Sequence, residues 1–186
     1  LVFVGRLVSD KGVEVLIAAL GQLAQRHRRV GLTVIGDGPE LPALQRQAMD
    51  LGVGEQVDFC GRRVGSALAS LLNEHQVLVV PSIWEEPFGV VALEAMGCGC
   101  IPLVSRSGGL PDAIGSGGVV VPLGDVDALA RAIEALLGDL PRIEHLRSAA
   151  PAHLERHTPD RVARDYLHVI TDACRVKPAQ SAQSVV

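Results

Sequence analysis

Several features that mark other classes of protein are scarce in this sequence. No apolar run approaches the roughly 18–20 residues that a membrane-spanning helix needs. The formal net charge is −4, so the chain lacks the basic excess that a phosphate backbone attracts, and we expect no nucleic acid partner. Four cysteines occur in 186 residues without a Cys-x-x-Cys pair, which favours a reduced, cytoplasmic compartment over a disulfide framework.

Aromatic residues and lysines are also rare. Aromatics make up 3% of the chain, against 48% for all hydrophobic residues, so we expect a core of Ala, Val, Leu and Ile. The length suggests one domain, which buries a sizeable core without disulfides or metal. Lys11 and Lys177 are the only two lysines, beside fifteen arginines. Lys11 falls at a predicted strand-to-helix turn, which makes it a candidate functional residue.

Short apolar runs alternate with amphipathic stretches along the chain. The runs lack regular polar alternation, which is typical of strands buried on both faces. Predicted strands are 1–4, 32–35, 57–60, 77–80, 101–104 and 119–121, and predicted helices are 9–24, 41–51, 67–72, 90–96, 126–137, 141–156 and 159–174. The alternation predicts an α/β domain: a Rossmann-like, doubly wound parallel sheet of about six strands, with helices on both faces and extra C-terminal helices.

The two ends of the sequence suggest its boundaries. Residues 1–176 are expected to form one domain, and 177–186 an unstructured tail of mainly Ala, Gln, Ser and Val. Leu1 is not an initiator methionine, and the first four residues already resemble a buried strand. We therefore expect a fragment of a longer protein whose upstream part is missing here.

Two cations follow the first predicted strand. Gly5 and Arg6 end this strand, and Asp10-Lys11-Gly12 opens the next helix. A doubly wound sheet binds its ligands at the carboxyl ends of its strands. Arg6, as a planar fork, and Lys11, as a point charge, would together grip a diphosphate. The alternative interpretation is two solvated surface charges.

The segment 79–109 has the densest set of candidate residues. A loop containing Glu86 leads to a predicted helix start at Phe88 and Gly89. The first amides of a helix have no intrahelical partner and bind phosphate. Glu86 and Glu94 lie eight positions apart, and ionised carboxylates accept hydrogen bonds only, so the pair suits sugar and ribose hydroxyls. An ordinary helix start with an N-terminal glutamate is the alternative.

Several segments carry a family resemblance. They are VGRLVSDKG, VIGDGPE, VDFCG, EEPFGVVALEAMGCGCIP and SGGLPDAI. In order and spacing, nearly the whole chain resembles the C-terminal, donor-binding domain of retaining GT-B glycosyltransferases, specifically glycosyltransferase family four, the glycosyl transferases group 1. No single segment is specific, but together they are highly specific.

The resemblance implies a role for each candidate. Arg6 and Lys11 would neutralise the donor diphosphate, and Glu86 would hold hydroxyls of the transferred sugar; these three are the predicted catalytic residues. Backbone amides at the start of the helix would contact the phosphates, Glu94 would hold the ribose, and the segment after Gly61 would meet the base. The predicted substrate-binding residues are Gly5, Arg62, Arg63, Phe88, Gly89, Val90, Val91 and Glu94.

The resemblance also implies a reaction. A hexosyl group would pass from a UDP-, GDP- or ADP-sugar, with UDP favoured, to an acceptor with retention of configuration. No cofactor and no metal are expected, because the cations and the helix start replace them. The acceptor, a sugar, lipid-linked sugar or small molecule, would bind the missing N-terminal domain, so the isolated chain should transfer little or nothing. Such enzymes are cytoplasmic, some of them peripheral to the inner face of the membrane.

Three other functions stay open. A non-catalytic sugar-nucleotide module would keep the binding residues without turnover. A glycoside hydrolase would use Glu86 and Glu94 as acid and base, but it has no need of Arg6 and Lys11. An NAD-dependent oxidoreductase is disfavoured because Leu41 stands where the third glycine of its phosphate-binding motif belongs. We instead expect the loop 36–38 to line the donor cleft.

Two metal-like patterns have simpler interpretations. Asp125-Val126-Asp127 spells a D-x-D motif, but it opens an apolar-striped helix, so Asp125 is predicted to cap that helix. His153 and His157 share a helix face, but a zinc site needs further ligands and no H-E-x-x-H motif occurs. We interpret these histidines as solvated, and predict no metal site.

Overall fold

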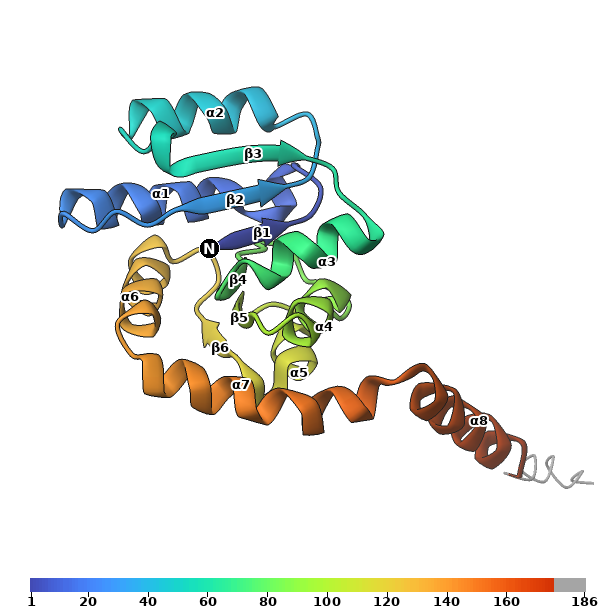
Figure 1. Cartoon of the computed structure of the whole chain (residues 1–186). Coiled ribbons are helices and arrows are strands. Elements are labelled where there is room, and N and C mark those ends of the chain that lie inside the picture. The colour runs from blue at the N-terminus through green and yellow to red at the C-terminus, as the bar shows by residue number, and fades with distance from the viewer. Residues whose placement is uncertain (176–186) are drawn as a thin grey trace, which may run out of the picture.

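The computed structural model describes residues 1–175, which form one parallel sheet covered by helices (Figure 1). The strands run in the order β3-β2-β1-β4-β5-β6, and every recorded pair is parallel. The strands are β1 (Val2–Val4), β2 (Leu32–Ile35), β3 (Val57–Gly61), β4 (Val77–Val80), β5 (Ile101–Ser105) and β6 (Val119–Val121). The chain is therefore Rossmann-like, as predicted, and its order reverses between β1 and β4.

Helices connect the strands and extend past the last one. They are α1 (Val13–Gln25), α2 (Leu41–Asp50), α3 (Gly65–Asn73), α4 (Val90–Gly97), α5 (Leu110–Ile114), α6 (Val126–Leu137), α7 (Leu140–Leu154) and α8 (Pro159–Arg175). Short 3-10 turns are η1 (Ser9–Lys11), η2 (Gly54–Gln56), η3 (Gly115–Gly117) and η4 (Glu155–His157). Figure 1 shows α8 projecting beyond α7. None of the described helices is long and apolar enough to cross a membrane.

Strand side chains alternate between two apolar layers. In β1, Phe3 packs into the layer that includes α1, α2 and α6, whereas Val2 packs into the layer formed with α3, α4 and α5. In β4, Val79 packs into the first of these layers and Leu78 into the second. Because both faces are covered, the central strands are apolar at every position, which explains the sequence pattern.

Three details differ from, or lie beyond, the sequence prediction. The first helix begins at Val13 rather than Ser9, because Gly12 adopts φ 66° and separates η1 from α1. The five-residue helix α5 was not predicted, since it is too short to show a helical stripe. The tail predicted at 177–186 lies outside the described residues.

Glycine is required where the loops after β1 and β2 meet. A Cβ at Gly36 would lie 1.8 Å from the carbonyl oxygen of Gly5. We predict that Gly36→Ala lowers the free energy of unfolding by about 1–3 kcal/mol, as overpacking does. At the control position Gly31, a Cβ meets nothing within 4 Å, so Gly31→Ala should be nearly neutral. Urea denaturation of both variants checks this, and equal midpoints would contradict the close approach.

Candidate functional site

Two adjoining cavities open at the carboxyl ends of the central strands. The β1–β4 cavity, of about 330 Å³, is lined by residues that include Gly5, Arg6, Lys11, Ser82, Glu86, Gly89, Val90 and Val91. The β1–β2 cavity, of about 510 Å³, is lined by Val4, Gly5, Arg6, Ile35, Gly36, Asp37, Arg62 and Arg63. Residues 4–6 belong to both, so one ligand could extend across the point where the strand order reverses.

An ion pair joins the two sides of the β1–β4 cavity. Lys11 Nζ lies 2.5 Å from Glu86 Oε1, and the Ser82 hydroxyl donates to the same oxygen at 2.7 Å. The Lys11 and Glu86 side chains are only 30% and 12% exposed. Burial of the carboxyl group opposes its ionisation, but the hydrogen bonds from Lys11 and Ser82 and the lysine charge outweigh it, so the pKa of Glu86 is lowered. The carboxylate is therefore ionised at neutral pH.

Backbone contacts fix the loops that carry this ion pair. The Ile83 amide donates to the Asp10 carbonyl at 3.0 Å, which ties the segment after β4 to the loop after β1. The Gly109 amide donates to the Glu86 carbonyl at 2.8 Å, and the Ser107 hydroxyl donates to the Trp84 carbonyl. Lys11 and Glu86, 75 positions apart in sequence, are thereby held on either side of one cavity.

The start of α4 presents free amides. Gly89, at φ 96°, precedes the helix, and no side chain caps its start. Within residues 1–175, no recorded hydrogen bond outside the helix uses the amides of Gly89, Val90 or Val91. A Cβ at Gly89 would lie 2.4 Å from Leu110 Cδ2, so α5 packs directly behind this turn. Free amides at the positive end of the helix dipole favour an anion in the cavity.

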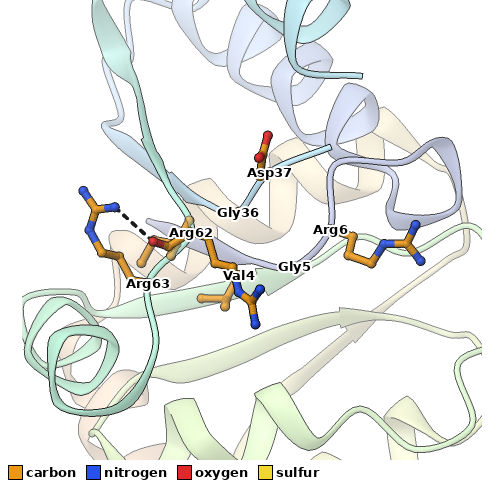
Figure 2. Close-up of a pocket in the computed structure, with 8 residues that line it drawn as sticks. Val4, Gly5, Arg6, Gly36, Asp37, Arg62 and Arg63 are labelled. Atoms are coloured by element: carbon orange, nitrogen blue, oxygen red, sulfur yellow. Dashed lines mark hydrogen bonds between the residues drawn. The ribbon is translucent and has the colours of Figure 1, made fainter. Parts of the chain in front are cut away.

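Arginines flank the larger cavity. Figure 2 shows Arg6 and Arg62 on opposite sides of it, with Gly5 and Gly36 between them. Arg63 donates from its guanidinium to the Arg62 carbonyl at 3.0 Å, which orders the turn after β3. Arg6 is exposed, and it forms no ion pair among those recorded for the described chain. Cations near both cavities make this edge of the sheet suited to a negatively charged ligand.

Most predicted site residues line the cavities, but two do not. Glu94 is exposed on α4 and lines neither cavity, and Phe88 packs instead against His157, with ring centroids 5.4 Å apart. The proposed ribose role of Glu94 stays a prediction. Sequence reasoning missed Ser82 and Ser107, which orient Glu86 and its loop. The only sign of them in the sequence is that a serine lies two residues after the end of each of the buried strands β4 and β5.

The interpretation of His153 as solvated is wrong, whereas His157 is half-buried. His153 is only 4% exposed, and its Nε2 lies 2.7 Å from the Ala113 carbonyl. The His157 ring packs on it at a centroid distance of 4.8 Å. The sequence pattern could not reveal this contact because α5 and η3, against which His153 packs, were not predicted. No group of three or more potential metal ligands occurs in the described part of the chain.

The predicted helix cap at Asp125 is confirmed. Its carboxylate accepts a hydrogen bond from the Ala128 amide at 2.8 Å. Asp127 accepts from the Gln22 side chain on α1 at 2.5 Å. The D-x-D pattern thus serves the start of α6 and its packing on α1.

Comparison with known proteins identifies relatives of this architecture. The family described as glycosyl transferases group 1 matches residues 1–153. The chain is 38% identical over 164 residues to the GDP-mannose-dependent alpha-(1-6)-phosphatidylinositol monomannoside mannosyltransferase of Mycolicibacterium smegmatis, which covers 84% of this chain and 42% of that protein.

Solved structures show the same likeness. Anabaena Alr3699/HepE, crystallised with UDP and glucose, superposes with a TM-score of 0.82 at 26% identity, covering 92% of this chain and 47% of that one. Sucrose-phosphate synthase from Thermosynechococcus elongatus gives 0.82 at 28% identity, covering 95% and 45%. The chain thus spans about half the length of these relatives. Its fold is that of GT-B proteins, and it belongs to the glycosyl transferases group 1 family.

Proposed function

We propose that this chain is the donor-binding, C-terminal domain of a retaining glycosyltransferase of family four. Its ligand is a nucleoside diphosphate sugar, and a hexosyl group passes to an acceptor bound by another domain. One observation carries the proposal: Arg6, Lys11 and the free amides of α4 surround a single cavity at the switch point of the sheet. Such a set of donors suits a diphosphate.

The ion pair suggests how the donor is engaged. Glu86 neutralises Lys11 through their ion pair. A diphosphate would compete for the ammonium group and release the carboxylate, which then accepts hydrogen bonds from sugar hydroxyls. Arg6, Lys11 and the α4 amides would stabilise the negative charge that grows on the departing nucleoside diphosphate. In other enzymes a metal ion stabilises such a charge. The domain would therefore act without metal.

The base would occupy the β1–β2 cavity beside Arg62 and Arg63. HepE was crystallised with UDP, whereas the mycobacterial relative uses GDP-mannose. We favour a UDP-sugar, with GDP- and ADP-sugars as alternatives. The acceptor, a sugar, lipid-linked sugar or small molecule, would meet the donor only in the longer protein, in the cytoplasm or at the inner membrane face. The isolated chain would bind donor and transfer little or nothing.

The glycosidase alternative has little structural support. A pair of catalytic carboxylates must face one substrate bond. Glu94 lines neither cavity, and Glu86 is held ionised by Lys11 and Ser82. Among the described residues that line the β1–β4 cavity, Glu86 is the only carboxylate, and its ionised form is poorly suited to donate a proton.

Nucleotide binding should stabilise the chain. We predict a rise in melting temperature with one of UDP, GDP or ADP and none with NAD; a ligand at about 100 times its Kd adds roughly 2.7 kcal/mol. Arg6→Ala and Lys11→Met should abolish the shift, because each removes a cation from the β1–β4 cavity. Arg131→Ala, exposed on α6 and outside both cavities, is the control. A shift that survives both site variants would contradict the proposed diphosphate site.

Glu86 should distinguish the sugar from the nucleotide. Glu86→Gln removes the charge that neutralises Lys11, so UDP should bind the variant at least as tightly as the original chain. UDP-glucose should lose the affinity gained from its sugar, by about three- to tenfold for one lost charge-assisted hydrogen bond. Isothermal titration with both ligands measures this. Equal losses for UDP and UDP-glucose would argue against a sugar-binding role.

A further inference from the structure

Three rings from separate parts of the chain stack behind the start of α4. His153 lies in α7, His157 ends η4, and Phe88 precedes the Gly89 turn. The His153 and His157 centroids lie 4.8 Å apart, and those of His157 and Phe88 lie 5.4 Å apart, both pairs tilted by 53°. Such distances and tilts are typical of favourable ring pairs. His157 is therefore the middle member of a chain of contacts that reaches the β1–β4 cavity.

A second line of contacts runs from the same histidines through α5. The Ala113 carbonyl can only accept a hydrogen bond, so the His153 Nε2 beside it carries a proton. A Cβ at Gly115 would lie 2.6 Å from the His153 ring, so the imidazole packs tightly on the end of α5. At the other end of α5, Leu110 packs on Gly89. Both lines of contact end at the turn that precedes the free amides.

We infer that His157 is a positioning residue for the nucleotide site, holding Phe88, and with it the start of α4, in the geometry that binds the diphosphate. The inference rests on the proposed function. His157 lines neither cavity; it contacts Phe88 directly, and it reaches α5 through His153. It does so as a neutral ring.

The surroundings of His157 disfavour its charged form. Burial, followed by the charges of His153 and Arg156, lowers the pKa of His157 below its ordinary value of 6.5. Other charged or titratable groups on the elements packed here include Glu155 on η4, Glu144, His145 and Arg147 on α7, Asp160 and Arg161 on α8, Asp112 on α5, and Glu85 and Glu86 before α4; none of them is among the causes of this shift.

The sign of the pH dependence follows from these contacts. Because the folded pKa of His157 is lowered, the packed arrangement is favoured at pH values above 6.5 and loses stability as the pH falls below 6.5 towards that lowered pKa. A positive charge on the partly buried His157 ring would be poorly solvated beside His153 and Arg156, and it would loosen the contact with Phe88. Acid should therefore weaken nucleotide binding through a group that touches no ligand.

Binding of UDP-glucose, with GDP-mannose in parallel, tests the inference on the chain itself at about pH 7.5 and about pH 5.5. These diphosphate diesters do not titrate in this range. His157→Ala should weaken binding about two- to tenfold at the higher pH, which is the change in affinity expected from the loss of one favourable ring pair. His157→Phe keeps a ring without charge, so it should retain the affinity and abolish the loss in acid. His145→Ala, at an exposed position on the neighbouring helix α7, should behave as the original chain.

Trp84, the only tryptophan, gives a readout that needs no ligand, because it lies in the loop before Phe88. Its fluorescence should change on acidification in the original chain and stay constant in His157→Phe. Unaltered affinity in His157→Ala, or an acid loss that persists in His157→Phe, would overturn the inference. If the original chain binds neither of these sugar nucleotides, nor ADP-glucose, the proposed function fails. A Trp84 signal that does not change with pH then overturns the positioning contact as well.

Discussion

The Lys11–Glu86 ion pair is the contact on which the site depends. It joins the loop after β1 to the loop after β4, the two adjacent strands at which the sheet reverses its order. Parallel pairing of these strands brings the loops to one edge, and the Ile83–Asp10 backbone bond fixes their separation. The pair also keeps a partly buried carboxylate charged. One interaction therefore joins two loops of the fold and also holds two charged groups of the candidate site in place.

The sequence predicts the sheet well, because its central strands are buried on both faces and their apolar runs have no other simple interpretation. Once the strands are parallel, residues at their carboxyl ends must converge, so Arg6, Lys11 and Glu86 could be placed at one edge without a structure. The sequence could not show that Lys11 and Glu86 pair with each other. That contact depends on the path of two irregular loops.

The errors come from tertiary packing that leaves no periodic signal. The four-residue spacing of His153 and His157 gave no sign that either side chain is buried. The unpredicted helix α5 nevertheless covers His153. Phe88 was predicted to bind the substrate, which stays a prediction, and its ring packs on His157. Both contacts lie in the layer behind the cavity. That layer, built from α5, α7 and η4, holds the start of α4 and belongs to the site as much as the residues that line it.

The central claim is that the α4 amides, together with Arg6 and Lys11, hold a diphosphate. Backbone NMR of the chain during titration with UDP tests it most directly, with GDP and ADP titrated in turn. The account predicts that, for the nucleotide that binds, the largest amide shifts fall at Gly89, Val90 and Val91, with smaller ones near Gly5 and Lys11. Saturable shifts confined to another surface, or none with any of the three nucleotides, would contradict it.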